Sequence, residues 1–227
     1  MAGVIRHKPI YVVCEPGVPS SLIQVVMEGI QEVLDLARAA DAQIEVKNFG
    51  IWREDPWRQD DQLLPHRSVD WYLQFSRENS RQGNQLSTVH LMHAMLVEPL
   101  QTTQPHYDVM ILHSDIYWED CIFIIGQAMA GILSIISVHR FLSLDSELSK
   151  GCVKTETMHE IGHMFGLPSE QRSDGTTEES IGLHCTNTCI MRQGLTIPKD
   201  FVRLTKDRLA RGPFCATCLR ELRQFFI

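Results

Sequence analysis

Long hydrophobic runs are scarce in this chain of 227 residues. The one sustained apolar segment, residues 121–137, contains Gly126, Gln127 and Gly131 and follows two acidic residues. It is short for a transmembrane helix, which needs about 20 apolar residues, and is more typical of buried strands around a turn. The sequence therefore predicts no membrane span and no membrane partner.

A secretory leader is also missing at the start. The apolar stretch there has only about five residues before Cys14, Glu15 and Pro16 intervene, whereas the apolar part of a signal peptide has about 7 to 15. We therefore expect a cytoplasmic protein whose cysteines are not paired in disulfides.

Basic residues are few outside the C-terminal end. Residues 1–191 contain 13 lysines and arginines against 25 aspartates and glutamates, while residues 192–227 contain 8 against 3. The acidic bulk weakens phosphate binding, so nucleic acid is not the expected partner. The basic end nevertheless leaves open a module that binds an acidic partner or nucleic acid.

The hydrophobic content of 44% is ordinary for a globular protein, and the chain is long enough to bury a good-sized core. Its periodicity predicts strands at residues 9–14, 42–50 and 106–115 and helices at residues 20–41, 69–81 and 87–98. This alternation predicts a layered α/β sheet in the N-terminal half. Beyond residue 165 the sequence reads as irregular and rich in cysteine.

Residues 159–163 read HEIGH. On a helix, His159 and His163 project from the same side one turn apart, which is the spacing that one zinc ion needs from two nitrogen ligands. Glu160 lies beside the first histidine and can reach a metal-bound water as general base. Gly166 can turn the chain sharply where the helix, expected at residues 152–165, must end. The alternative is a chance pattern, which the terminal glycine and the apolar helix face disfavour.

Seven cysteines are present. Four lie close together in the last part of the chain: Cys185, Cys189, Cys215 and Cys218. Two such pairs can close a tetrahedral zinc site of the structural type, although four unrelated buried thiols are the simpler alternative. The other three are expected to be plain buried thiols: Cys14, Cys121 and Cys152.

The segments HEIGHMFGL, HCTNTCIM and CATC, in this order, resemble the archaemetzincin (archaelysin) family of zinc metallopeptidases in the metzincin clan. That family's signature is HExxHxxGxxHC, followed by a second cysteine, a methionine and CxxC. HSDIYWED and GQAMAGILSIISVHRF extend a weaker similarity upstream. The resemblance implies that His159, His163 and His184 hold a catalytic zinc ion and that Glu160 activates its water. It also implies a second, structural zinc at the four cysteines, with Met191 in the turn beneath the catalytic metal.

One departure from the signature concerns the third ligand. The signature places it at Ser169, but the next histidine is His184, after 15 additional residues, 168–182. Serine is a poor zinc ligand. The added stretch, expected to be an exposed and mobile loop, offers four carboxylates as alternatives: Glu170, Asp174, Glu178 and Glu179. We expect His184 because Cys185 adjoins it and fixes it from the C-terminal side.

These observations predict an α/β (α+β) protein with a metzincin-like twisted mixed sheet and a small zinc-stapled C-terminal subdomain. Residues 1–167 and 168–227 are expected to form one catalytic unit, a monomer that hydrolyses peptides or proteins through a zinc-bound water activated by Glu160, with two zinc ions per chain. The strand at residues 132–138 could pair with an extended substrate, or serve structure alone. The alternative function is a non-catalytic, zinc-stabilised binding protein that uses its basic C-terminal tail.

Overall fold

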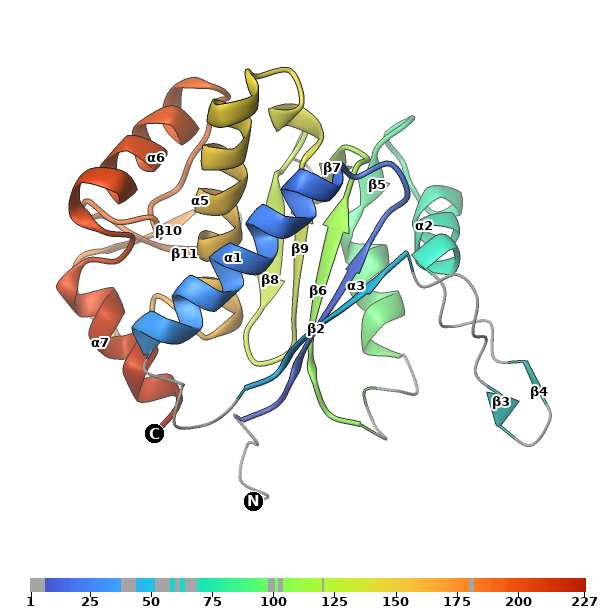
Figure 1. Ribbon diagram of the computed structural model, residues 1–227, viewed down its shortest axis with the longest axis horizontal. Helices are drawn as coiled ribbons and strands as arrows, with labels where there is room; N and C mark the ends of the chain where they lie inside the picture. Colours follow the sequence, from blue (N-terminus) through green and yellow to red (C-terminus); the bar gives the residue numbers. More distant parts are fainter. Residues whose placement is uncertain are drawn as a thin grey trace.

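The computed structural model describes residues 7–37, 44–51, 58–59, 62–63, 69–97, 101, 104–119, 121–179 and 182–227. Within these residues a five-stranded sheet lies between two layers of helices (Figure 1). None of the described helices is both long enough and apolar enough to cross a membrane.

The sheet has the strand order β2-β1-β6-β9-β8. Neighbouring strands run parallel except β8, which is antiparallel to β9 and forms one edge. The strands are β1 (Ile10–Cys14), β2 (Val46–Gly50), β6 (Tyr107–Leu112), β8 (Gly126–Met129) and β9 (Leu133–Ser137). The predicted N-terminal strands are confirmed, and the apolar segment forms β8 and β9 around a turn, as expected.

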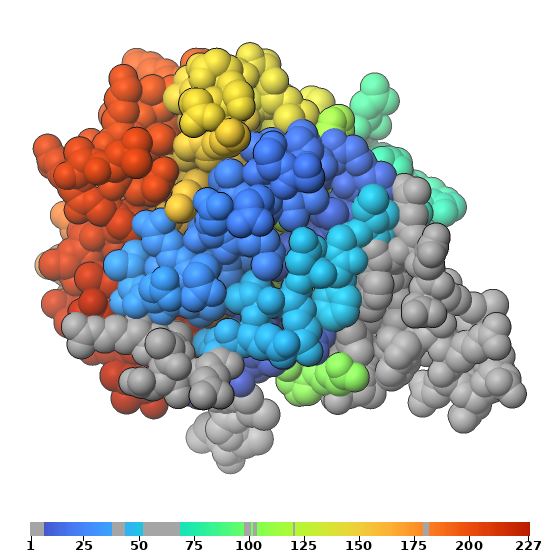
Figure 2. All heavy atoms as spheres, in the orientation of Figure 1, coloured from blue at the N-terminus to red at the C-terminus, as the bar shows by residue number. Residues whose placement is uncertain are grey.

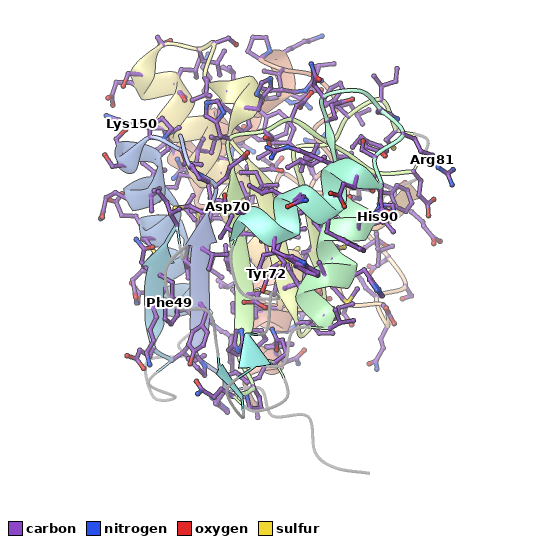
Figure 3. All side chains as sticks on the ribbon, turned by 90° about the vertical axis from the view of Figure 1, so that its right-hand side faces the viewer. Phe49, Asp70, Tyr72, Arg81, His90 and Lys150 are labelled. Atoms are coloured by element: carbon purple, nitrogen blue, oxygen red, sulfur yellow. The ribbon has the colours of Figure 1, made fainter. Side chains whose placement is uncertain are left out.

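Helices cover both faces of the sheet. Helices α1 (Ser20–Ala37) and α5 (Ser146–Met164) pack on one face, and α2 (Val69–Glu78) and α3 (Thr88–Leu96) pack on the other. Figure 3 shows Asp70 and Tyr72 of α2 and His90 of α3 on the side of the sheet away from α1. Because both faces are buried, β1, β6 and β9 are hydrophobic almost throughout. The expected α/β (α+β) class with a mixed sheet is confirmed.

Helix α5 begins earlier than expected. It starts at Ser146, whereas the sequence predicted residue 152, and the side chain of Asp145 caps it by accepting a hydrogen bond of 3.0 Å from the Leu148 amide. The first turns of the helix are mostly polar, so the apolar pattern did not reveal them. The helix ends at Met164, and Gly166, just beyond it, has a φ of 75°, the left-handed conformation that the sequence predicted for it.

The C-terminal part is not irregular, so that expectation is wrong. It contains α6 (Lys199–Arg211) and α7 (Ala216–Phe225). Helix α6 packs against α5, and α7 packs against α1. On the face shown in Figure 2, α1 lies beside α5 and the C-terminal helices. Phe201, Leu204 and Arg208 are buried at helical spacing, a pattern that was available in the sequence.

The described residues of the added stretch, 168–179 and 182, are largely exposed, as expected, but part of the stretch forms a strand rather than a loop. Strand β10 (Thr176–Glu179) pairs antiparallel with β11 (Gly182–Cys185), so that Thr177 lies opposite His184. The remaining short elements are β3 (Arg58–Gln59), β4 (Gln62–Leu63), β5 (Leu86–Ser87), β7 (Ile116–Tyr117) and the 3-10 helix η2 (His139–Phe141).

Candidate active site

Three histidines from two elements converge beside the edge strand β8. His159 and His163 come from α5, and His184 comes from β11. Their nitrogens approach closely: the two Nε2 atoms of His159 and His163 are 3.0 Å apart, and one nitrogen of each ring lies within 4.8 Å of the others. The structure therefore brings together all three histidines that the sequence singled out.

The backbone orients these rings. Nδ1 of His159 donates to the carbonyl oxygen of Ile190 at 2.6 Å, and Nδ1 of His184 donates to the carbonyl oxygen of Gly182 at 3.0 Å. His163 makes a hydrogen bond with the backbone of Leu167. A carbonyl oxygen can only accept, so Nδ1 of His159 and of His184 carries the ring proton and Nε2 keeps its lone pair.

His159 and His163 are neutral near pH 7. Burial, together with the nearby His184, lowers the pKa of His159 to about 3. Burial and the two neighbouring imidazoles hold the pKa of His163 well below its ordinary value. The two Nε2 atoms of His159 and His163, 3.0 Å apart, are close enough to share a hydrogen bond or to bind one cation between them. Neutral imidazoles at this spacing suit zinc, whose bonds to nitrogen are about 2.0 to 2.1 Å long.

The acidic alternatives for the third ligand are not part of the histidine cluster. Among the described side chains of His, Cys, Asp and Glu, the group that could hold a metal here contains His184 but not Glu170, Asp174 or Glu178. The side chain of Glu179 lies outside the described residues. The geometry thus favours three nitrogens over two nitrogens and an oxygen.

Glu160 lies between the histidines and β8. Its side chain is buried, and no described residue hydrogen-bonds its Oε2 atom. Gly126 of β8 faces it: a Cβ atom on Gly126 would lie 2.5 Å from Cγ of Glu160. A buried carboxylate oxygen without a partner costs free energy, so it is suited to receive a hydrogen bond from a ligand in the site.

A second buried carboxyl group, Glu156, lies one turn earlier on α5 and also lines the site. Burial raises the pKa of Glu156 to about 8, and burial together with Glu156 raises the pKa of Glu160. The sequence reasoning missed Glu156. Its spacing of four from Glu160 was the available signal, because it places both carboxyl groups on one helix face.

Met191 lies directly against the active-site helix. A Cβ atom on Gly162 would be 2.5 Å from its Sδ atom, so the helix and the methionine pack in contact. Met191 is fully buried, and its carbonyl oxygen accepts a hydrogen bond from the Cys185 amide. This contact joins the segment after β11 to the centre of the HEIGH motif.

A cleft of about 770 Å³ opens over the histidines and Glu160. Strand β8 forms one wall, residues 192–195 form another, and residues 168–171 of the added stretch reach its mouth. Gln127 and Gln193 line it, and each has a buried Oε1 atom without a partner in the described part of the chain. The strand predicted to pair with a substrate was the wrong one, because β9 lies between β6 and β8 and the edge belongs to β8.

The four clustered cysteines converge as well. One Sγ atom of each lies within 4.8 Å of the others, and those of Cys185 and Cys215 are 3.9 Å apart. Zn–S bonds of about 2.3 Å in a tetrahedron place sulfur atoms about 3.8 Å apart, so the spacing suits zinc. None of the four forms a disulfide. Outside this cluster, Cys14 and Cys152 are buried as predicted, whereas Cys121 is half-buried and lines the cleft.

The added stretch contributes one buried charge to the cysteine cluster. Arg172 donates to Sγ of Cys218 at 3.1 Å and to Sγ of Cys185 at 3.5 Å. The same guanidinium group pairs with both carboxylate oxygens of Glu221 on α7. Sequence reasoning did not single out Arg172, because an arginine in a polar stretch reads as exposed.

Comparison with known proteins places this site in context. Residues 102–224 match the model of peptidase family M54. An archaemetzincin from Archaeoglobus fulgidus is 33% identical over 112 residues, which are 48% of this chain and 55% of the relative. An archaemetzincin from Nanoarchaeum equitans is 27% identical over 112 residues, 49% of this chain and 49% of the relative. The chain thus spans about half the length of the curated relatives it matches.

Solved structures resemble the whole fold. The crystal structure of an archaemetzincin from Methanopyrus kandleri has a TM-score of 0.63 at 19% identity and covers 99% of this chain and 98% of its own. That of an archaemetzincin from Archaeoglobus fulgidus, complexed with malonate, has a TM-score of 0.55 at 21% identity and covers 94% and 99%. The fold is therefore that of the archaemetzincin structures, C-terminal helices included.

Proposed function

The chain belongs to peptidase family M54, and from this premise we propose that it is a zinc-dependent metallopeptidase that hydrolyses peptide bonds. One observation carries the proposal: three imidazoles meet in an open cleft beside a buried carboxylate oxygen that has no hydrogen-bond partner among the described residues. Substrates are peptides or proteins, because strand β8 lines the cleft and its outer edge pairs with no other strand of the described sheet.

The ligand sets follow from the two clusters. His159, His163 and His184 would hold the catalytic ion, since three protein ligands beside a cleft are typical of catalytic zinc. The cysteine cluster offers four sulfur atoms and no open position, which is typical of structural zinc. We therefore propose two zinc ions per chain. Because the histidines come from both sides of residue 167, residues 1–167 and 168–227 act as one catalytic unit.

Glu160 supplies the proton transfers. The three histidines would hold a zinc ion that would supply Lewis-acid chemistry, lowering the pKa of a bound water and polarising the scissile carbonyl group. The free Oε2 atom of Glu160 takes a proton from the attacking water and later gives it to the leaving amine. Burial and Glu156 raise the pKa of Glu160, and a carboxyl group of raised pKa binds the transferred proton more firmly until the second step.

Strand β8 positions the substrate. In the described sheet its outer edge pairs with no other strand, and it forms a wall of the cleft. An extended peptide can pair with this edge through backbone hydrogen bonds. The pairing places the scissile peptide bond next to Glu160. The amide oxygens of Gln127 and Gln193 then accept hydrogen bonds from the substrate. We also propose a cytoplasmic location, which the absence of disulfides among the seven cysteines supports.

The proposal is tested by comparing the wild type with Glu160→Gln on a mixture of unstructured peptides, with cleavage read by mass spectrometry. Zinc content is measured on both proteins. The expected result is cleavage by the wild type, at least about 100-fold slower cleavage by the variant, and equal zinc content. A wild type that holds two zinc ions and cleaves nothing favours the alternative, a non-catalytic binding protein that uses its basic tail.

A further inference from the structure

Arg172 has an unusual position for a residue of an added surface segment. Its side chain is only 3% exposed, and its guanidinium group lies between α7 and the cysteine cluster. It makes hydrogen bonds to two cysteine sulfur atoms and a bidentate ion pair with Glu221. Burying an arginine costs free energy unless its N–H donors are satisfied. These contacts to the cysteines and Glu221 offset that cost.

The charges around it explain the arrangement. Four thiolates around one divalent ion carry a net charge of about −2, and hydrogen bonds to the sulfur atoms stabilise that charge. Neutral donors also serve the cluster: the Asn187 side chain reaches Cys215, the Cys215 amide reaches Cys189, and the backbone of Asn187 and of Met191 reaches Cys185 and Cys189. Among the described residues, Arg172 is the donor to these sulfur atoms that brings a positive charge, and it contacts Cys185 and Cys218.

The same arginine is tied to the catalytic histidines through the backbone. Strand β11 carries His184 and Cys185 in adjacent positions, so one strand contributes to both clusters. The strand is held from one side by pairing with β10 and from the other by the hydrogen bond between the Cys185 amide and Met191. Arg172 lies just before β10 and holds Cys185 by its sulfur atom.

We propose that Arg172 is a positioning residue that clamps the added hairpin to the cysteine metal centre and, through Cys185, sets the place of His184. This rests on the proposed function only for the identity of the metal. Relative to the signature, His184 lies 15 residues farther from His163. The clamp replaces the short connection that otherwise brings the third histidine back to the helix.

The test measures metal binding rather than catalysis. Wild type, Arg172→Met, Arg172→Lys and Glu221→Gln are loaded with cobalt, and the thiolate-to-cobalt charge-transfer band reports the cysteine centre alone. Competition with a chelator then gives zinc affinity for both centres. Arg140→Met is the matched control, because Arg140 also makes a bidentate pair, with Asp115, and contacts no cysteine or histidine of the clusters.

For Arg172→Met we expect a shifted band and an affinity lower by about 10- to 100-fold at the cysteine centre, with a smaller loss at the histidines. Arg172→Lys keeps the positive charge but not the planar set of donors of the guanidinium group, so its loss of metal affinity is intermediate. Arg140→Met lowers the melting temperature and leaves both affinities unchanged. If Arg172→Met fails to fold, Arg172→Lys and Glu221→Gln carry the comparison.

The proposal is overturned if the Arg172 variants have the cobalt spectra and metal affinities of the wild type, whatever their melting temperatures. Arg172 and Glu221 would then form an ion pair that has no effect on the metal centres. A lower affinity at the cysteines with an unchanged histidine centre overturns the coupling to His184. The outcome is independent of turnover: an inactive wild type with the expected cobalt results contradicts the peptidase and leaves the clamp intact.

Discussion

Gly126 and Glu160 face each other so closely that no larger residue fits at position 126. A Cβ atom there would lie 2.5 to 2.6 Å from Cγ, Cδ and Oε1 of Glu160. The absence of a side chain on the edge strand thus determines where the carboxylate of the active-site helix can lie.

We expect Gly126→Ala to lower the rate of peptide cleavage by at least about 10-fold. The added methyl group displaces the Glu160 carboxyl group from the position in which it can transfer a proton. Zinc content stays at the wild-type value, since the histidines are untouched. Gly29→Ala is the control: its Cβ atom would meet Thr157 at 3.0 Å in the contact between α1 and α5, away from the cleft. That variant loses stability and keeps its specific activity. Full activity in Gly126→Ala contradicts the assigned place of Glu160.

The cysteine cluster is expected to stabilise the fold through its metal. Cys215→Ser removes one of four sulfur ligands, and the free energy of unfolding falls by several kcal/mol, on the order of 3 or more. Cys121→Ser, at a half-buried thiol outside the cluster, changes it by less than about 1 kcal/mol. Denaturant unfolding with and without a chelator measures both. Equal stability of Cys215→Ser and the wild type in zinc rules out a structural ion.

The buried carboxyl pair predicts a pH dependence in the metal-free protein. The pKa of Glu156 is about 8 in the folded chain against an ordinary value of 4.5, so the proton is held more tightly in the folded state. The stability that this proton contributes is complete below about pH 4.5 and is lost as the pH rises to about 8.

The glutamine of Glu156→Gln cannot ionise, so the variant does not lose stability as the pH rises. We expect the variant and the wild type to have equal stability near pH 4.5 and the variant to be more stable at pH 8, by on the order of 4 kcal/mol. Chemical denaturation of the metal-free proteins across this range measures the difference. A difference that does not vary with pH shows that Glu156 is not a buried titrating group.

Local patterns predicted the parts of the site that are local in the chain. The spacing of His159 and His163 defines a helix face by itself, and Gly166 marks the end of that helix. The start of α5 was missed because the capping Asp145 precedes polar residues rather than an apolar stripe. His184 was found through the family signature and the neighbouring Cys185, since nothing in local spacing relates it to the helix 21 positions earlier.

Features that depend on contacts between distant segments were not predictable in this way. The apolar segment was read correctly as strands around a turn, but which of β8 and β9 forms the edge depends on pairing with β6. Arg172 reads as one charge in a polar stretch, and its burial follows only once α7 brings Glu221 beside it. In each case the missing information is which elements become neighbours.

The central claim is that two zinc ions are bound, one by three histidines and one by four cysteines. An anomalous difference map at the zinc edge, from crystals of the zinc-loaded protein, tests it most directly. Two peaks are expected: one with Nε2 of His159, His163 and His184 at about 2.0 to 2.1 Å, and one with the four sulfur atoms at about 2.3 Å. A map without a peak at the histidines, or with a carboxylate of Glu170, Asp174, Glu178 or Glu179 in place of His184, contradicts it.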